Sequence, residues 1–300
     1  LAIFNFVQLF GWSDALADKE YFFNLPRQQT DAEREGWLRT ERPPGPLPEL
    51  KMYCPQGRAL CTLYDANGFV AGLQVALPVD DYESLAIKPE KRFIKWRVPA
   101  SNGEPAKEYW TATQYYVSEE SLKAGAGPTL ENGETLQDGG VWVAGLDGKL
   151  LRIPATEAEL NTTSFKRQNC IPNMGTHYYH NLTKDMNCED ILPWFALTSN
   201  TELVGTGFQM VGKLFKQPVR EWFEKFTGGI RVTRLLFTKL YYNVDFLLFK
   251  VLTNLSIEPL LSLQMVAPNA PECLEEWVKS YGLVSLHIYY IEKPWTIRCK

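Results

Sequence analysis

The sequence predicts a single β-rich α+β domain, built on a mainly antiparallel sheet or barrel with a few peripheral helices. Three observations lead to this prediction. Asn67-Gly68 and Asp147-Gly148 each separate two apolar runs, and such dipeptides are the strongest short signal for a β-hairpin. Further alternating runs recur between turn signals, and 300 residues with 45% apolar content can bury one large core.

The first 17 residues have features of a secretory signal peptide that lacks its start. Residues 1–12 are mostly apolar, and Ala15-Leu16-Ala17 has the small-x-small form of a cleavage site, so the mature chain would begin near Asp18. The alternative is an amphipathic first helix with apolar residues at helical spacing. That helix would bury Ile3, Phe6, Val7 and Phe10.

Residues 18–50 differ in composition from the rest of the chain. They are rich in charge before position 42, and the segment from Arg42 to Pro48 contains four prolines that favour a stiff, polyproline-like conformation. We therefore predict an N-terminal arm with a Pro-rich segment over 18–50, and one globular disulfide-linked domain over 51–300.

Apolar alternation predicts the strands of this domain. They are expected at 60–65, 69–77, 93–98, 109–117, 141–146, 149–153, 194–198, 203–211 and 284–291. Helices are expected at 219–226, where apolar residues recur at i, i+3, i+4 and i+7, and between Pro271 and Gly282. Residues 118–140 fit a long loop, 231–255 are ambiguous, and we find no internal repeat.

Six cysteines indicate a disulfide framework, with pairing of sequence neighbours as the simplest arrangement and buried thiols as the alternative. The pairs would be Cys54 with Cys61, Cys170 with Cys188, and Cys273 with Cys299. N-glycosylation sequons begin at Asn161, Asn181 and Asn254. With the N-terminal segment, these features predict a secreted, extracellular glycoprotein.

Composition argues against several functional classes. The net charge is −4 and no basic stripe is visible, whereas nucleic-acid binding needs clustered Lys and Arg. Gly207 to Lys213 is similar to a phosphate-binding loop, but Leu214 replaces the Ser or Thr that binds magnesium, so we expect no nucleotide cofactor. No run of about 20 uncharged apolar residues occurs, so we expect no membrane span.

The segment from Cys170 to Cys188 holds two of the three histidines, His177 and His180. A helix would place them on one face and a strand on opposite faces, and the preceding Pro and Gly disfavour the helix. Strand geometry therefore separates the two, and either one could meet the third histidine, His287, only if distant segments come together.

The histidines support three interpretations. With a carboxylate from Asp185, Glu189 or Asp190, the set of His177, His180 and His287 would suit zinc, copper or iron. Without a metal, His177 would act as general base, His287 as its partner and Tyr179 as a hydrogen-bond donor. The third interpretation is that all three are structural or surface histidines.

Aromatic residues near the histidines are candidates for the wall of a ligand pocket, because Tyr and Trp combine an apolar ring with a polar tip. We select Tyr178, Tyr289 and Trp110 for this role. Ordinary core packing is the alternative.

Several short motifs around the histidines and cysteines form a set. They are Met174-Gly175-Thr176-His177-Tyr178, Cys188, Cys273-Leu274, and His287-Ile288-Tyr289 with Pro294 and Cys299. Together they resemble a family of secreted, cysteine-containing invertebrate proteins, over about residues 54–299. The resemblance implies secretion and singles out His177 and His287 above His180, but it implies no activity.

The sequence thus predicts a secreted glycoprotein that binds or transforms a small apolar or aromatic molecule in a pocket lined by His and Tyr. One alternative is a metal- or oxygen-dependent secreted enzyme, an oxidoreductase that could be luciferase-like. The other is a non-catalytic structural or defence protein of extracellular fluid.

Overall fold

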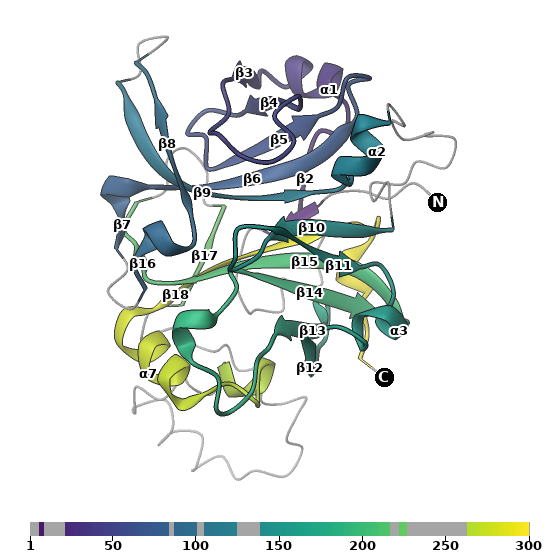
Figure 1. Cartoon of the computed structure of the whole chain (residues 1–300), viewed down its shortest axis with the longest axis vertical. Coiled ribbons are helices and arrows are strands. Elements are labelled where there is room, and N and C mark those ends of the chain that lie inside the picture. The colour runs from purple at the N-terminus through teal and green to yellow at the C-terminus, as the bar shows by residue number, and fades with distance from the viewer. Residues whose placement is uncertain are drawn as a thin grey trace.

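The computed structural model describes residues 6–8, 22–83, 87–100, 105–124, 139–216, 222–226 and 263–299. The described strands form two large antiparallel sheets with a few short helices at their periphery (Figure 1). This architecture confirms the predicted β-rich α+β class.

The N-terminal sheet has the strand order β11-β10-β9-β6-β5-β4-β3, with β8 paired to β9. Most neighbours in this sheet are consecutive in the chain, so it is a meander. Its strands are β3 (Leu38–Thr40), β4 (Lys51–Cys54), β5 (Leu60–Tyr64), β6 (Val70–Pro78), β8 (Ile94–Val98), β9 (Lys107–Tyr115), β10 (Gly140–Ala144) and β11 (Leu150–Pro154).

Both predicted hairpins are present in this sheet. Gly68 and Gly148 have φ angles of +82° and +78°, which a residue with a side chain adopts only with strain. In each turn the preceding aspartate, Asp65 or Asp147, accepts backbone hydrogen bonds through its carboxylate. The turn chemistry therefore fixes the registers of β5 with β6 and of β10 with β11.

The C-terminal sheet has the order β12-β13-β14-β15-β18-β1-β2, with β17 paired to β18. Its strands are β1 (Phe6–Gln8), β2 (Phe22–Asn24), β12 (Phe165–Ile171), β13 (Gly175–His180), β14 (Trp194–Ser199), β15 (Glu202–Val211), β17 (Glu224–Phe226) and β18 (Leu283–Tyr289). Two further short strands pair with each other: β7 (Tyr82–Glu83), which follows β6, and β16 (Lys213–Leu214), which follows β15.

The two sheets share one succession of strands, although the sequence shows no repeat. The series β5, β6, β7, β8, β9 corresponds in order and pairing to β14, β15, β16, β17, β18. In both series the fourth strand pairs with the fifth, and the two third strands pair with each other. A meander requires only alternating apolar residues, so similar topologies can form without similar sequences.

Buried side chains form three layers, of which the largest lies between the sheets. Phe93 and Phe208 meet there with ring centroids 6.0 Å apart, as do Tyr116 and Tyr290 at 5.6 Å. We call the side of each sheet that faces this layer its inner face, and the opposite side its outer face. Each outer face buries a further apolar cluster of its own.

Short helices flank the sheets (Figure 1). They are α1 (Gln29–Arg34), α2 (Glu119–Lys123), α3 (Glu157–Leu160), α7 (Glu272–Tyr281) and the 3-10 turns Val79–Asp81, Pro89–Lys91, Cys188–Asp190 and Pro294–Thr296. The helix α7 starts after Pro271 and ends at Gly282, as predicted, and buries Leu274 and Val278 in the outer cluster of the C-terminal sheet. Among helices in the described ranges, none combines the length and apolarity needed to cross a membrane.

Two sequence-based assignments differ from the structure. Residues 224–226 form β17 rather than the end of the helix expected at 219–226, because pairing with β18 buries Glu224 beside polar partners. The long loop expected at 118–140 contains α2. The ambiguous segment 231–255 lies outside the described residues.

The segment predicted as an N-terminal arm belongs to the main core. Ala32, Trp37 and Leu50 are buried, and β3 pairs with β4. Within the segment predicted as a signal peptide, β1 pairs with β18 and with β2. Cleavage near Asp18 stays a prediction.

Three disulfide bonds are present, and two of the expected pairings were wrong. Cys54 pairs with Cys61 as predicted, but Cys170 pairs with Cys299 and Cys188 with Cys273. The chain after β18 runs back beside β12, where Asn173 N–H donates to the carbonyl of Ile297, and this brings Cys299 to Cys170. Sequence distance is therefore a poor guide to pairing, since folding brings remote segments together.

Candidate functional site

His177 and His287 meet on the outer face of the C-terminal sheet. His177 lies on β13 and His287 on β18, with two strands between them, yet their ring centroids are 6.0 Å apart in an edge-to-face arrangement. Both residues are buried, with 1% and 4% of their surfaces exposed. Alternation along β18 places His287 and Tyr289 on this face and Leu286 and Ile288 in the inner layer, as the sequence predicted.

A glycine allows the rings to converge across the intervening strands. Tyr179, Phe195, Gly207 and His287 lie in register across β13, β14, β15 and β18. A Cβ atom on Gly207 would lie only 1.8 Å from the ring of Phe195, so this ring occupies the space above the glycine. Phe195 thereby comes within 5.5 Å of both His177 and His287, measured between ring centroids.

Glu224 on β17 completes the cluster. Its Oε1 lies 3.3 Å from Nδ1 of His287, and its Oε2 accepts a hydrogen bond of 3.1 Å from the hydroxyl of Ser285. Glu224 is itself only 4% exposed. A buried carboxylate held by two neighbours fixes the orientation of the imidazole, and it favours a proton on Nδ1 and a free lone pair on Nε2.

Glu224 was not identified from the sequence, because helical spacing was assigned to residues 219–226. One signal was available: Ser285 and His287 are two residues apart on a predicted strand and share its otherwise apolar outer face. Two buried polar groups on one face need a partner from another element. The two side chains therefore predict a polar partner on another element, but they do not identify the residue.

Two polar atoms in this cluster lack partners. Nine side-chain atoms in the described residues are buried without a hydrogen bond, and those in this cluster are Nδ1 of His177 and Nε2 of Gln209. Nδ1 of His180, on the opposite face of β13, is another. Gln209 lies in register with Ser285, which in turn faces Glu224.

Burial, and secondarily the neighbouring His287, lowers the pKa of His177 to about 3, so its imidazole is neutral at pH 7. Backbone hydrogen bonds with Gly175 and Asn169 oppose this shift without cancelling it.

Aromatic rings line the remainder of the cluster. Tyr179 stacks on His177 with centroids 6.2 Å apart, and Tyr289 stacks on His287 at 6.4 Å. Burial raises the pKa of both phenols far above the ordinary value, so both are neutral. Phe22 on β2 packs against Tyr289 from the adjoining edge of the sheet.

Three other predicted site residues lie elsewhere. His180 packs edge-to-face on Phe165, whose side chain belongs to the inner layer, because residues three apart on a strand point to opposite faces. Tyr178 points to the inner layer and donates a hydrogen bond to Glu157. Trp110 belongs to β9 of the other sheet, where the ammonium of Lys95 lies over its ring.

His180 therefore cannot join His177 and His287 around one metal ion. Over the described ranges, no group of three or more His, Cys, Asp or Glu side chains is arranged to hold a metal ion. The proposed carboxylate ligand Glu189 instead pairs with Lys91, at 2.9 Å.

Two of the three sequon asparagines are exposed. Asn161 follows α3 and Asn181 follows β13, so both are accessible to modification, while Asn254 lies outside the described residues. Three disulfides are compatible with an extracellular protein.

Comparison with known proteins finds no family model, no curated protein and no solved structure that matches this chain.

Proposed function

We propose that this protein is a secreted glycoprotein that binds a small, neutral aromatic molecule carrying a hydrogen-bond donor, such as a phenol or an aromatic amine. The ligand would lie against the outer face of the C-terminal sheet, beside the contact between His177 and His287. The observation that carries the proposal is the buried Nδ1 of His177, which lacks a partner among the described residues and lies in a cluster with the His287–Glu224 pair.

An unpartnered buried nitrogen is energetically unfavourable. Leaving such a group without a hydrogen bond costs about 1–3 kcal/mol, and a ligand donor would remove that cost. Because the pKa of His177 is lowered to about 3, the imidazole is neutral and can offer a lone pair. The second unpartnered group, Nε2 of Gln209, is a donor and would pair with an oxygen of the ligand.

The surroundings select for a neutral aromatic ligand. Tyr179, Phe195 and Tyr289 offer ring faces and edges, and such contacts favour another aromatic ring. An ionic ligand would incur a large desolvation penalty in this cluster, because the carboxylate of Glu224 already binds Ser285 and His287.

The same residues have the arrangement of a general base. Glu224 orients His287, whose Nε2 would accept the proton of a bound phenol or amine, while neutral His177 would hold the ligand in place. The sequence assigned the base to His177; the carboxylate partner favours His287 instead. Removal of this proton would lead to catalysis only if the deprotonated ligand is the form that reacts.

The site is closed in this structure. The helix α7 packs over the outer cluster, and the Cys188–Cys273 disulfide ties its first turn to the segment before β14. Asn169 further donates a hydrogen bond to the carbonyl of Met265. A ligand would enter by displacing this cover, which predicts slow association.

Fluorescence titration with N-phenyl-1-naphthylamine tests the proposal, because this neutral probe has aromatic rings and one N–H donor. We expect saturable 1:1 binding, and His177→Leu should weaken it about tenfold, the equivalent of one hydrogen bond of about 1.4 kcal/mol. The N-methylated probe lacks the donor, so it should bind wild-type protein about tenfold more weakly than the parent probe does. The N-methylated probe should bind His177→Leu no more weakly than it binds wild-type protein.

His180→Leu is the matched control, because His180 lies on the same strand but on the opposite face. It should leave probe binding unchanged. Absence of saturable binding, or equal losses in His177→Leu and His180→Leu, would contradict the proposal. Glycosidase treatment of protein secreted by a eukaryotic host tests modification at Asn161 and Asn181, through a fall in mass.

A further inference from the structure

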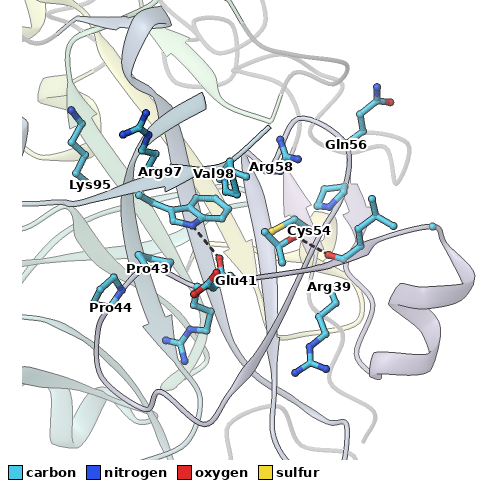
Figure 2. Close-up of a pocket in the computed structure, with 17 residues that line it drawn as sticks. Arg39, Glu41, Pro43, Pro44, Cys54, Gln56, Arg58, Lys95, Arg97 and Val98 are labelled. Atoms are coloured by element: carbon cyan, nitrogen blue, oxygen red, sulfur yellow. Dashed lines mark hydrogen bonds between the residues drawn. The ribbon is translucent and has the colours of Figure 1, made fainter. Parts of the chain in front are cut away.

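A groove on the N-terminal sheet lies apart from the histidine cluster and encloses about 610 Å³. Three segments line it: residues 38–44 of β3 and its extension, residues 54–56 with Arg58 after β4, and residues 95–99 of β8 (Figure 2). We call it the basic groove. Its volume falls within the range of about 300–1,000 Å³ that is typical of small-molecule sites.

Cationic side chains dominate the lining of the basic groove. Arginine or lysine occurs at positions 39, 42, 58, 95 and 97, against one acidic residue, Glu41. The chain as a whole has 35 acidic and 31 basic residues. The groove therefore has the opposite charge balance to the rest of the protein, and a low-dielectric concave wall strengthens its attraction for anions.

Two of the five cationic side chains bind other groups of the protein. Arg42 donates to the carbonyls of Leu47 and Pro46 and so holds the proline-rich wall. Lys95 forms an ion pair with Glu108 at 2.8 Å.

Arg39 and Arg97 remain available to a ligand. Both side chains are exposed, and among the described residues neither guanidinium forms an ion pair or a side-chain hydrogen bond. Arg97 lies in register with Glu108, whose nearer cationic partner is Lys95. Figure 2 shows their guanidinium groups at different parts of the groove. A planar guanidinium binds carboxylate, phosphate or sulfate through two parallel hydrogen bonds.

The walls of the basic groove are fixed in advance. The indole N–H of Trp96 donates to the carbonyl of Glu41 at 3.1 Å and joins β8 to the extension of β3. The Cys54–Cys61 disulfide holds the turn after β4, and prolines at 43, 44, 55 and 99 restrict the backbone. A preformed site loses little conformational entropy when it binds a ligand.

We infer that the basic groove binds a compact small molecule with two or more anionic groups and an apolar body. Arg39 and Arg97 contact separate anionic groups, and the exposed Pro44 and Pro99 contact the apolar part. Carboxylates, phosphate esters and sulfate esters share the required chemistry. The basic groove lies on the N-terminal sheet, whereas the neutral ligand is proposed to bind the C-terminal sheet. The two sites are therefore independent.

Isothermal titration of the full chain at low salt with citrate, pyrophosphate and sucrose octasulfate tests the inference. We expect one equivalent of at least one probe to bind, with affinity that falls as salt is raised. Binding of citrate alone identifies carboxylates as the ligand chemistry, and binding of pyrophosphate or the octasulfate identifies phosphate or sulfate esters.

The double variant Arg39→Gln/Arg97→Gln should weaken binding at least tenfold. The control Lys166→Gln/Arg167→Gln removes the same charge from exposed positions on β12 and should not change the affinity beyond about twofold. No saturable binding of any probe, or equal losses in the two double variants, overturns the inference. Neither double variant should alter N-phenyl-1-naphthylamine binding, which keeps the two sites experimentally distinct.

Discussion

The C-terminal sheet carries a buried polar cluster on each face, and the two clusters differ in how completely they are hydrogen-bonded. On the inner face, Thr206 donates to Oε1 of Gln114 at 2.7 Å and lies 2.6 Å from the hydroxyl of Tyr290. Nε2 of Gln114 donates to the hydroxyl of Tyr116 at 2.9 Å. Every polar side-chain atom of this inner network has a partner.

The outer cluster is built from similar groups but is incomplete. Glu224, Ser285 and His287 satisfy one another, whereas His177 and Gln209 each retain a buried atom without a partner in the described residues. A saturated network specifies how two sheets pack, because any shift breaks several bonds. An unsaturated one costs stability, and such a cost is typical of sites that act on another molecule.

The largest expected effect concerns the cover of the outer cluster. The Cys188–Cys273 disulfide closes a separation of 85 residues, and in the chain-entropy model its removal by Cys188→Ser/Cys273→Ser should cost about 4–5 kcal/mol. Guanidinium unfolding measures this loss. The control Cys54→Ser/Cys61→Ser opens a separation of only 7 residues and should cost about 2 kcal/mol; equal losses would contradict the loop-length argument.

Next in size is the contrast between the two polar clusters themselves. Gln114→Ala should lower the free energy of unfolding by about 3 kcal/mol, since it leaves buried hydroxyls unpaired and creates a cavity. His177→Leu should cost less, about 1 kcal/mol, because Nδ1 is already unpaired and only the interactions of the ring with the backbone of Gly175 and Asn169 are lost. Urea denaturation compares the two, and the comparison fails if His177→Leu costs as much as Gln114→Ala.

A third effect tests the packing that joins the two histidines. Gly207→Ala should cost about 1–3 kcal/mol, because the added methyl group occupies the position of the Phe195 ring. In Gly207→Ala/Phe195→Leu the smaller side chain relieves the clash, so the double variant should lose less than the sum of the single losses. Thermal unfolding of the three variants measures this coupling, and strict additivity would exclude the contact as its cause.

The fourth effect is a pH dependence, which is close to zero at pH 7 and grows only as the pH falls below 6.5. The folded pKa of His177, about 3, is below the unfolded value of 6.5, so the unfolded chain binds more protons between these values. Stability should fall as pH drops from 6.5 toward 3, by at most about 1.4 kcal/mol per pH unit from this group.

The titratable groups near His177 and on its strand show how much of that slope can be assigned to His177. Tyr179 from β13 and Tyr289 from β18 have raised pKa values and do not titrate in this range, while His180 has a lowered pKa and adds a slope of the same sign. Denaturation at several pH values should therefore show a reduced slope in His177→Leu, with the contribution of His180 retained. An unchanged slope would contradict the assignment to His177.

Local patterns in the sequence were sufficient for much of the fold. The Asn-Gly and Asp-Gly turns, the alternation along β6, β9 and β18, and the Pro and Gly that bound α7 act between near neighbours, so a single segment contains the information. Alternation also predicted that strand geometry separates His177 from His180.

Only the tertiary structure decided how these segments combine. The Glu224 carboxylate, the Phe195 ring above Gly207 and the Cys170–Cys299 and Cys188–Cys273 pairings all join residues that are remote in sequence. The sequence by itself determined that His177 and His180 occupy opposite faces of their strand. The partners of each histidine depended on the order of strands in the sheet and on the space that glycines leave. Both are properties of the folded protein and cannot be read from a single segment.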